Sequence, residues 1–193
     1  MRIACLAAAS VLALAAVPAF AAPVPPAAAV RQDVTDADLA RYAAAEEGVR
    51  PIAAQLNGAA PTAEQQAAMV AAIEGAGLTL DRFNAISQAV QAGDQVLAAR
   101  LAVARAPASP AGSVGAAATD AELGQFAAAM AAVRPIAEQL NGAAPTAEQQ
   151  AAMAEAIASS GLALERFNAI SSALPADPRL QARVALAAAR DDG

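Results

Sequence analysis

The chain has 193 residues, with 12 basic and 18 acidic side chains, a net charge of −6 and no histidine. Its one cysteine, Cys5, lies in the N-terminal segment, so the rest of the chain has neither residue type, which argues against Ser-His, Cys-His and histidine-metal chemistry. Because about a third of the residues are alanine and aromatic residues make up 3%, the composition predicts an all-α fold. The arginines are scattered, and this argues against nucleic-acid binding.

The first 21 residues have the pattern of a secretory signal peptide. Residues 3–17 are apolar and residues 19–21 read Ala-Phe-Ala, a small-x-small cleavage pattern. The apolar stretch is shorter than the ~20 residues that span a bilayer. We therefore predict cleavage, export to the periplasm or the exterior, and no stable membrane span afterwards; an uncleaved anchor is the alternative. Residues 22–34 are Pro/Ala-rich, which predicts a disordered segment.

The next feature is an internal repeat with an offset of 84 residues. Residues 50–69 read RPIAAQLNGAAPTAEQQAAM, and residues 134–153 read the same except for one position. The match continues on both sides, and after a one-residue deletion the offset becomes 83. This repeat predicts two tandem helical modules, at 35–105 and 119–190. Residues 106–118 are rich in Pro, Ser, Gly and Ala, and we expect a flexible linker there.

Within the first module, the first predicted helix begins at Thr35. Asp38 follows at the spacing of a capping box, and Leu39 and Tyr42 recur at helical spacing. Pro51 interrupts this pattern, so we expect the helix to kink or restart there.

The second predicted helix begins at Thr62 and carries Met69 and Ile73 on its core side. Gly77 ends this helix, and Leu78 stands where a Schellman cap places its hydrophobic contact.

Thr79 caps a third predicted helix, and Asp94 caps a fourth; Ala163 and Asp177 are their counterparts in the second module. Each module would then have three or four helices in about 70 residues, a size at which stability is marginal. Packing of the two modules together, or self-association, would supply the missing stability.

Residues 77–87, GLTLDRFNAIS, follow a Met/Ile helix and precede an Asp-x-x-Leu-x-x-Arg pattern. This combination resembles the signature of the bacterial domain-of-unknown-function family 4168, and the resemblance covers both modules. It implies an exported, helical protein and no activity that can be carried over. The second module departs from the pattern at Ala163, which affects only a helix cap.

The repeated Gly-Leu and Arg-Phe-Asn-x-Ile motif is the candidate site. Each Asn could orient a ligand, or it could tie its helix to a neighbouring loop carbonyl; we favour the structural role because a buried amide must find hydrogen-bond partners. Each Phe is expected to pack on the first helix, near Tyr42 or Phe126. The motif residues are Gly77, Leu78, Arg82, Phe83, Asn84 and Ile86, with Gly161, Leu162, Arg166, Phe167, Asn168 and Ile170.

No residue pattern predicts a catalytic, cofactor-binding or metal site. We therefore expect an exported, non-enzymatic protein, in which a helical interaction or structural module is used twice toward an unknown protein partner in the cell envelope. The alternative is a periplasmic carrier that holds a small apolar ligand between its Ala-rich helices.

Overall fold

The structure is a computed structural model that describes residues 34–56, 58–140 and 142–191, and every regular element within these ranges is a helix. The all-α prediction is confirmed for this part of the chain. The predicted signal peptide and nearly all of the Pro/Ala-rich segment lie outside the described residues. None of the described helices is long and apolar enough to cross a membrane.

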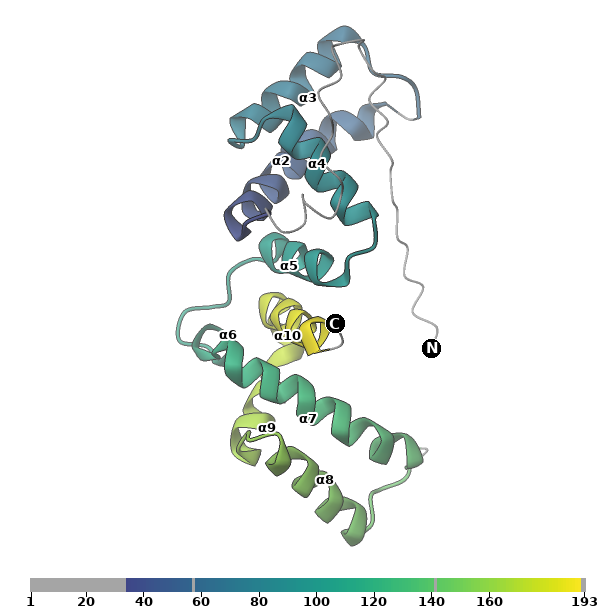
Figure 1. The fold of residues 1–193 in the computed structure, drawn as a ribbon, viewed down its shortest axis with the longest axis vertical. Helices are drawn as coiled ribbons and strands as arrows, with labels where there is room; N and C mark the ends of the chain where they lie inside the picture. Colours follow the sequence, from purple (N-terminus) through teal and green to yellow (C-terminus); the bar gives the residue numbers. More distant parts are fainter. Residues whose placement is uncertain (1–33, 57, 141, 192–193) are drawn as a thin grey trace.

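The helices form two groups, which we call the first half (34–105) and the second half (106–191). Figure 1 shows the two groups at opposite ends of an elongated molecule, with α5 and α10 side by side at its middle. The first half contains α2 (Asp36–Gln55), α3 (Ala63–Gly75), α4 (Leu80–Gln91) and α5 (Gln95–Arg105). The second half contains α6 (Val114–Ala117), α7 (Asp120–Gln139), α8 (Ala147–Ser159), α9 (Leu164–Ala173), the 3-10 helix η1 (Leu174–Ala176) and α10 (Pro178–Asp191).

The helix starts follow the caps that the sequence predicts. Thr35 and Asp38 form a reciprocal capping box at the start of α2. The carboxylates of Asp94 and Asp177 each accept a hydrogen bond from a backbone N–H in the first turn of α5 and α10, at 2.9 Å in both cases. Ala163 makes no side-chain cap at the start of α9, as expected.

The end of α3 is also as predicted. Gly77 has φ = +82°, a left-handed conformation that suits glycine. Its N–H donates to the carbonyl of Glu74, and the N–H of Leu78 donates to the carbonyl of Ile73, which together form a Schellman motif. Leu78 is buried beyond this cap, so the end of α3 is tied to the core.

The predicted restart at Pro51 is wrong, because α2 continues through this residue to Gln55. Pro135 lies in the same way inside α7. Each proline is close to the end of its helix, so the missing N–H and the ring crowding affect only the last turns.

Each half has its own buried cluster of apolar side chains. Both clusters draw on the long first helix, on the helix that carries the Arg-Phe-Asn motif and on the last helix of that half. The most deeply buried large side chains are Leu39, Met69, Ile86 and Leu101 in the first half, and Leu123, Phe126, Ile170 and Leu180 in the second.

Residues 106–118 differ from the flexible linker that the sequence predicts, because they lie against α10 and contain α6. Arg179 donates to the carbonyl of Ala106 at 3.2 Å, and Arg183 donates to the carbonyl of Gly115 at 3.0 Å. Ser109 donates to Asp177 at 3.0 Å. Small residues let this backbone approach α10 closely, and the arginines of α10 bind the carbonyl groups that the segment exposes.

Candidate functional site

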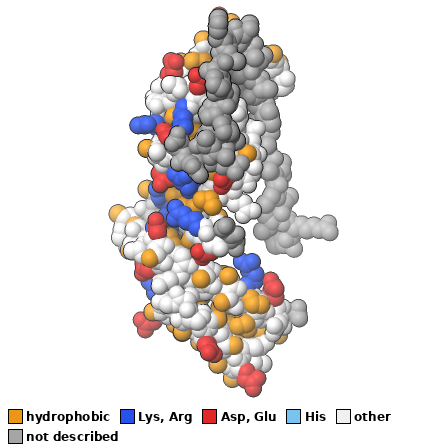
Figure 2. All heavy atoms as spheres, viewed as in Figure 1, with side chains coloured by type: hydrophobic (Ala, Val, Ile, Leu, Met, Phe, Trp, Pro, Cys, Tyr) orange, Lys and Arg blue, Asp and Glu red, His pale blue; other side chains and the backbone are white. Residues whose placement is uncertain are grey.

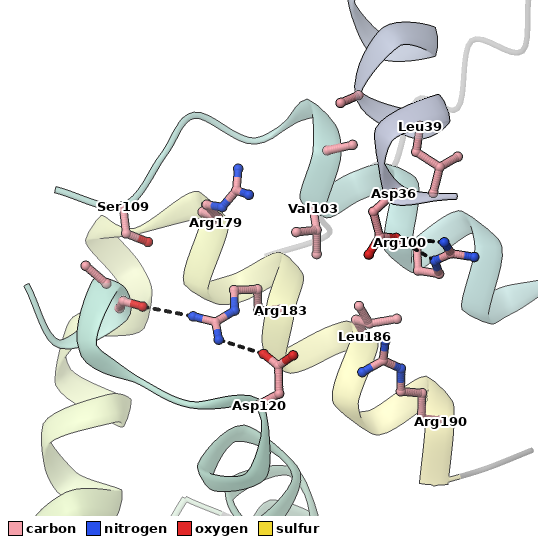
Figure 3. A pocket seen from close by; sticks show the side chains of 14 residues that line it. Asp36, Leu39, Arg100, Val103, Ser109, Asp120, Arg179, Arg183, Leu186 and Arg190 are labelled. Atoms are coloured by element: carbon pink, nitrogen blue, oxygen red, sulfur yellow. Dashed lines mark hydrogen bonds and ion pairs between the residues drawn. The ribbon is translucent and has the colours of Figure 1, made fainter. Parts of the chain in front are cut away.

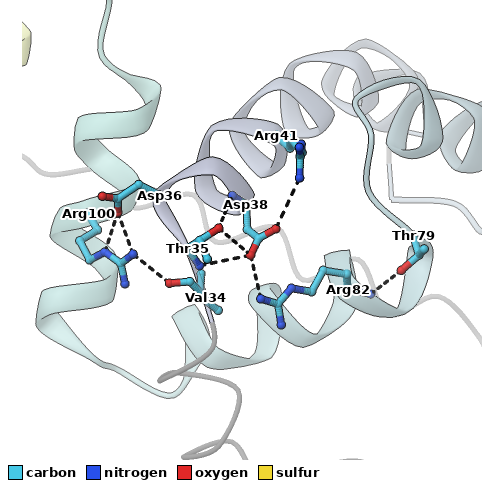
Figure 4. Close-up of polar contacts among 8 residues, drawn as sticks. All are labelled: Val34, Thr35, Asp36, Asp38, Arg41, Thr79, Arg82 and Arg100. Atoms are coloured by element: carbon cyan, nitrogen blue, oxygen red, sulfur yellow. Dashed lines mark hydrogen bonds and ion pairs between the residues drawn. The ribbon is translucent and has the colours of Figure 1, made fainter.

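The arginine of the repeated motif links the motif helix to the first helix of its half. The Nη2 atom of Arg82 on α4 lies 2.8 Å from Oδ2 of Asp38, the residue that completes the capping box of α2 (Figure 4). In the second half, Arg166 donates to both carboxylate oxygens of Glu122, at 2.8 and 3.2 Å. The hydrogen bond from Arg82 lowers the pKa of Asp38, and the one from Arg166 lowers the pKa of Glu122 to about 2.

The phenylalanine of the motif packs on the first helix, as predicted. The rings of Phe83 and Tyr42 stack with centroids 4.8 Å apart, and those of Phe167 and Phe126 are 4.9 Å apart. Phe126 is almost fully buried, whereas the two motif rings are only partly buried. The ring on the first helix is therefore the deeper core residue of each pair.

The asparagine of the motif is exposed in both halves, so the expectation of a buried amide tied to a loop carbonyl is wrong. The described residues offer no hydrogen-bond partner to Asn84 or Asn168. Phe83 and Ile86 face inward from α4, and Asn84, one residue after Phe83, points about 100° away around the helix. Of the remaining motif residues, Ile86, Ile170, Leu78 and Leu162 are buried, and Gly77 and Gly161 both have φ = +82°.

A cleft of about 460 Å³ lies where the two halves meet, between α5 and α10. Arg100 of α5 donates to Asp36 at the start of α2, at 2.7 and 2.9 Å. The equivalent Arg183 of α10 donates to Asp120 at the start of α7, at 2.7 Å (Figure 3). Both ion pairs line the cleft, so equivalent residues of the repeat face each other across it.

The same cleft contains two arginines that the first half does not have. Arg179 and Arg190 of α10 line it, and the equivalent positions of the first half hold Val96 and Pro107. Figure 2 shows basic, acidic and apolar side chains meeting near the middle of the face that it presents. Four arginines and two aspartates line this cleft, which makes it locally basic in a chain whose net charge is −6.

A second cavity, also of about 460 Å³, is an open apolar groove on the second half, between α7, η1 and α10. Its floor includes Phe126 and Val184, and Met130, Leu174 and Ala188 line it as well. Met130 is 42% exposed, which makes it one of the two large apolar side chains that are most exposed in the described part of the chain.

The first half has an ion pair where the second half has this groove. Arg105 of α5 binds both carboxylate oxygens of Glu46 on α2, at 2.6 to 2.8 Å. The equivalent residues of the second half are Ala188 and Met130. The loss of both charged side chains leaves apolar surface uncovered between α7 and α10.

Neither cavity was predicted from the sequence. Arg100 and Arg183, which line the cleft, both contact the N-terminal ends of other helices. A position-by-position comparison of the two copies would have found the groove and the additional arginines. The charged residues at positions 46 and 105 become apolar in the second copy, and the uncharged residues at positions 96 and 107 become arginines.

Neither cavity has the side chains of a metal centre or of a catalytic triad. The described residues contain no group of three or more His, Cys, Asp or Glu side chains placed to hold a metal ion. The two cavities are an apolar groove with Arg134 at its rim and a cleft lined by arginines. Comparisons with family models, with curated proteins and with solved structures found no match to this chain, so the likeness to family 4168 stays a resemblance.

Proposed function

We propose that this protein is an exported, non-catalytic binding protein of the cell envelope, in which two copies of one helical module are packed into one unit and the second copy binds a small apolar ligand. The signal-peptide pattern of the first 21 residues supports export, and the repeat supports duplication of one module. The lack of His throughout the sequence supports a role in binding rather than in catalysis.

The groove between α7 and α10 is the observation on which the proposal rests. Both copies have four equivalent helices and an aromatic pair at the same place, yet only the second lacks the ion pair that covers this surface in the first. The volume of about 460 Å³ is within the usual range for small-molecule sites, which are mostly apolar with a few polar groups. Arg134 at the rim suits a ligand with a carboxylate at one end.

Arg134 differs from its counterpart in its charge environment. The equivalent Arg50 pairs with Glu47 one turn earlier on α2, but the second half has Ala131 at that position. Two neighbouring glutamates of the first half are thus replaced by apolar residues beside the groove. Both replacements favour an apolar ligand, and the second also leaves the charge of Arg134 available to an acidic group.

A second candidate function is docking of a protein partner through the same groove. The exposure of Met130 favours it, because flexible methionine side chains adapt to many apolar partners. A peptide helix with apolar side chains at helical spacing would cover Met130 and Leu174 together.

The test replaces two groove residues of the second half by the charged residues that stand at the equivalent positions of the first half. Met130→Glu combined with Ala188→Arg should restore the ion pair in the second half and close the groove. Protein isolated from its own envelope would be analysed by native mass spectrometry. The parent chain should carry a small apolar molecule, and the double variant should lose it.

Glu46→Met combined with Arg105→Ala is the matched control, because it exchanges the same residue types in the first half and leaves the groove unchanged. Recovery of the parent chain without any bound small molecule would contradict the carrier role. A partner protein captured by the parent but not by the groove-closing variant would favour the second candidate.

A further inference from the structure

We propose that the cleft between α5 and α10 binds a small multivalent anion that carries phosphate or carboxylate groups. This site is separate from the apolar groove and does not depend on the function proposed for it. It exists only where the two halves meet, because neither half supplies all of its arginines.

The first argument is the balance of charge in the cleft. Asp36 and Asp120 are each already bound by one arginine, at 2.7 Å. Arg179 donates to a backbone carbonyl, and Arg190 makes no ion pair with any described residue. These two guanidinium groups are therefore available to an anion, and guanidinium groups bind phosphate and carboxylate oxygens in pairs.

The second argument is the position of the arginines along α10. Arg179, Arg183 and Arg190 are four and seven residues apart, so they lie on one face of the helix. Figure 3 shows all three on the side of α10 that lines the cleft. A ligand with two or more anionic groups could contact this row at several points, and a single monovalent ion could not.

The third argument is the framework around the cleft. The long helices α2 and α7 both begin at aspartates that line it, so the positive ends of two helix dipoles lie beside the arginines. Val103 and Leu186, which are equivalent in the repeat, add apolar lining. An anion in this cleft is therefore partly shielded from water, which strengthens its interaction with the arginines.

The net charge of −6 works against such binding at long range. The local site must overcome this repulsion, so we expect a ligand with a high density of negative charge to bind better than one with few charges. Inorganic pyrophosphate has this property and serves as the probe.

The experiment is a titration of the full mature chain with pyrophosphate at low ionic strength, followed by calorimetry and by NMR shifts of backbone amides. We expect saturable binding, with shifts centred on α10 and on residues 106–118. Arg179→Gln combined with Arg190→Gln should weaken binding by at least about tenfold, since each charge-assisted hydrogen bond contributes a comparable factor. Arg50→Gln, an exposed arginine outside the cleft, should leave binding unchanged.

Vesicles with phosphatidic acid form a parallel arm, because a lipid headgroup presents the same phosphate chemistry. Cosedimentation that the double variant loses, without pyrophosphate binding, would assign the cleft to a headgroup rather than to a free ligand. Failure of both probes to bind the parent would overturn the proposal. So would binding that Arg50→Gln weakens as much as the double variant does, because the charge of the whole chain and not the cleft would then be responsible.

Discussion

The two halves share a helical plan but cover the space between their first and last helices in different ways. In the first half, Arg105 and Glu46 close this space with a bidentate ion pair. In the second half, Ala188 and Met130 leave it open and apolar. An exposed ion pair contributes little to stability, so its loss has a small energetic cost and exposes a surface that can bind. Duplication thus allows one copy to keep the closed form while the other changes.

The aromatic pairs give the largest expected effect in this comparison. Phe126 is almost fully buried, so Phe126→Ala should lower the free energy of unfolding by about 3–5 kcal/mol. Phe167→Ala should cost less, because the Phe167 ring is only partly buried. Urea denaturation followed by circular dichroism measures both. Equal losses for the two variants would show that the first-helix ring is not the deeper core residue.

Gly115→Ala tests how closely residues 106–118 pack on the start of α10. A Cβ atom at this position would lie 2.0 Å from Oδ2 of the buried Asp177 side chain. We expect a loss of about 1–3 kcal/mol, because the chain must shift to remove the clash. Gly124→Ala is the control within a helix: its Cβ would meet no atom within 4 Å, so stability should rise by about 0.5–1 kcal/mol. A harmless Gly115→Ala would show that this segment is loosely held.

Removal of the ion pair in the first half should change stability only slightly. Glu46→Met combined with Arg105→Ala is expected to shift the free energy of unfolding by less than about 1 kcal/mol. The same variant should expose apolar surface beside Tyr42, which a fluorescent apolar dye would report. A large loss of stability would mean that the ion pair is a structural requirement, and the open second half would then need another explanation.

The last comparison concerns the dependence of stability on pH. The hydrogen bonds from Arg166 hold the pKa of Glu122 at about 2, below its ordinary value of 4.5. The stabilisation from this pair is therefore complete above pH 4.5 and is lost as the pH falls toward 2. Glu122→Gln should lose stability at neutral pH and should vary less than the parent between pH 4.5 and 2. Parallel acid titrations by circular dichroism would check this, and identical acid profiles would contradict it.

The same titration compares the halves. The hydrogen bond from Arg82 lowers the pKa of Asp38, so the first half should also lose stability in acid. Asp38→Asn is the corresponding variant, and it should also flatten the acid profile.

Local features of the fold were predictable from the sequence, and features that depend on distant contacts were not. The caps at Thr35 and Asp94 and the Schellman end at Gly77 depend on residues within one or two turns, so spacing was enough to find them. The position of Asn84 on an outer face could have been read from helical periodicity, and our expectation neglected it.

The packing of α5 against α10 connects residues far apart in the chain, and no local pattern encodes it. The cleft and the attachment of residues 106–118 follow from that packing, which is why the sequence predicted a flexible linker instead. The groove was not predicted for a different reason. It exists because Met130 replaces a glutamate of the first half, and this replacement is found only when the two copies are aligned.

The contact between α5 and α10 has a consequence for a protein with a single copy. These two helices occupy the same place in the repeat, and the equivalent residues Val103 and Leu186 line the same cleft. A contact between equivalent surfaces is the isologous kind on which two-fold symmetric homodimers are built. In this chain the two copies of the helix meet within one polypeptide, so the contact that would join two subunits joins its two halves. Joined in this way, the partners no longer need to be identical, and each is free to acquire substitutions that symmetry would otherwise impose on both.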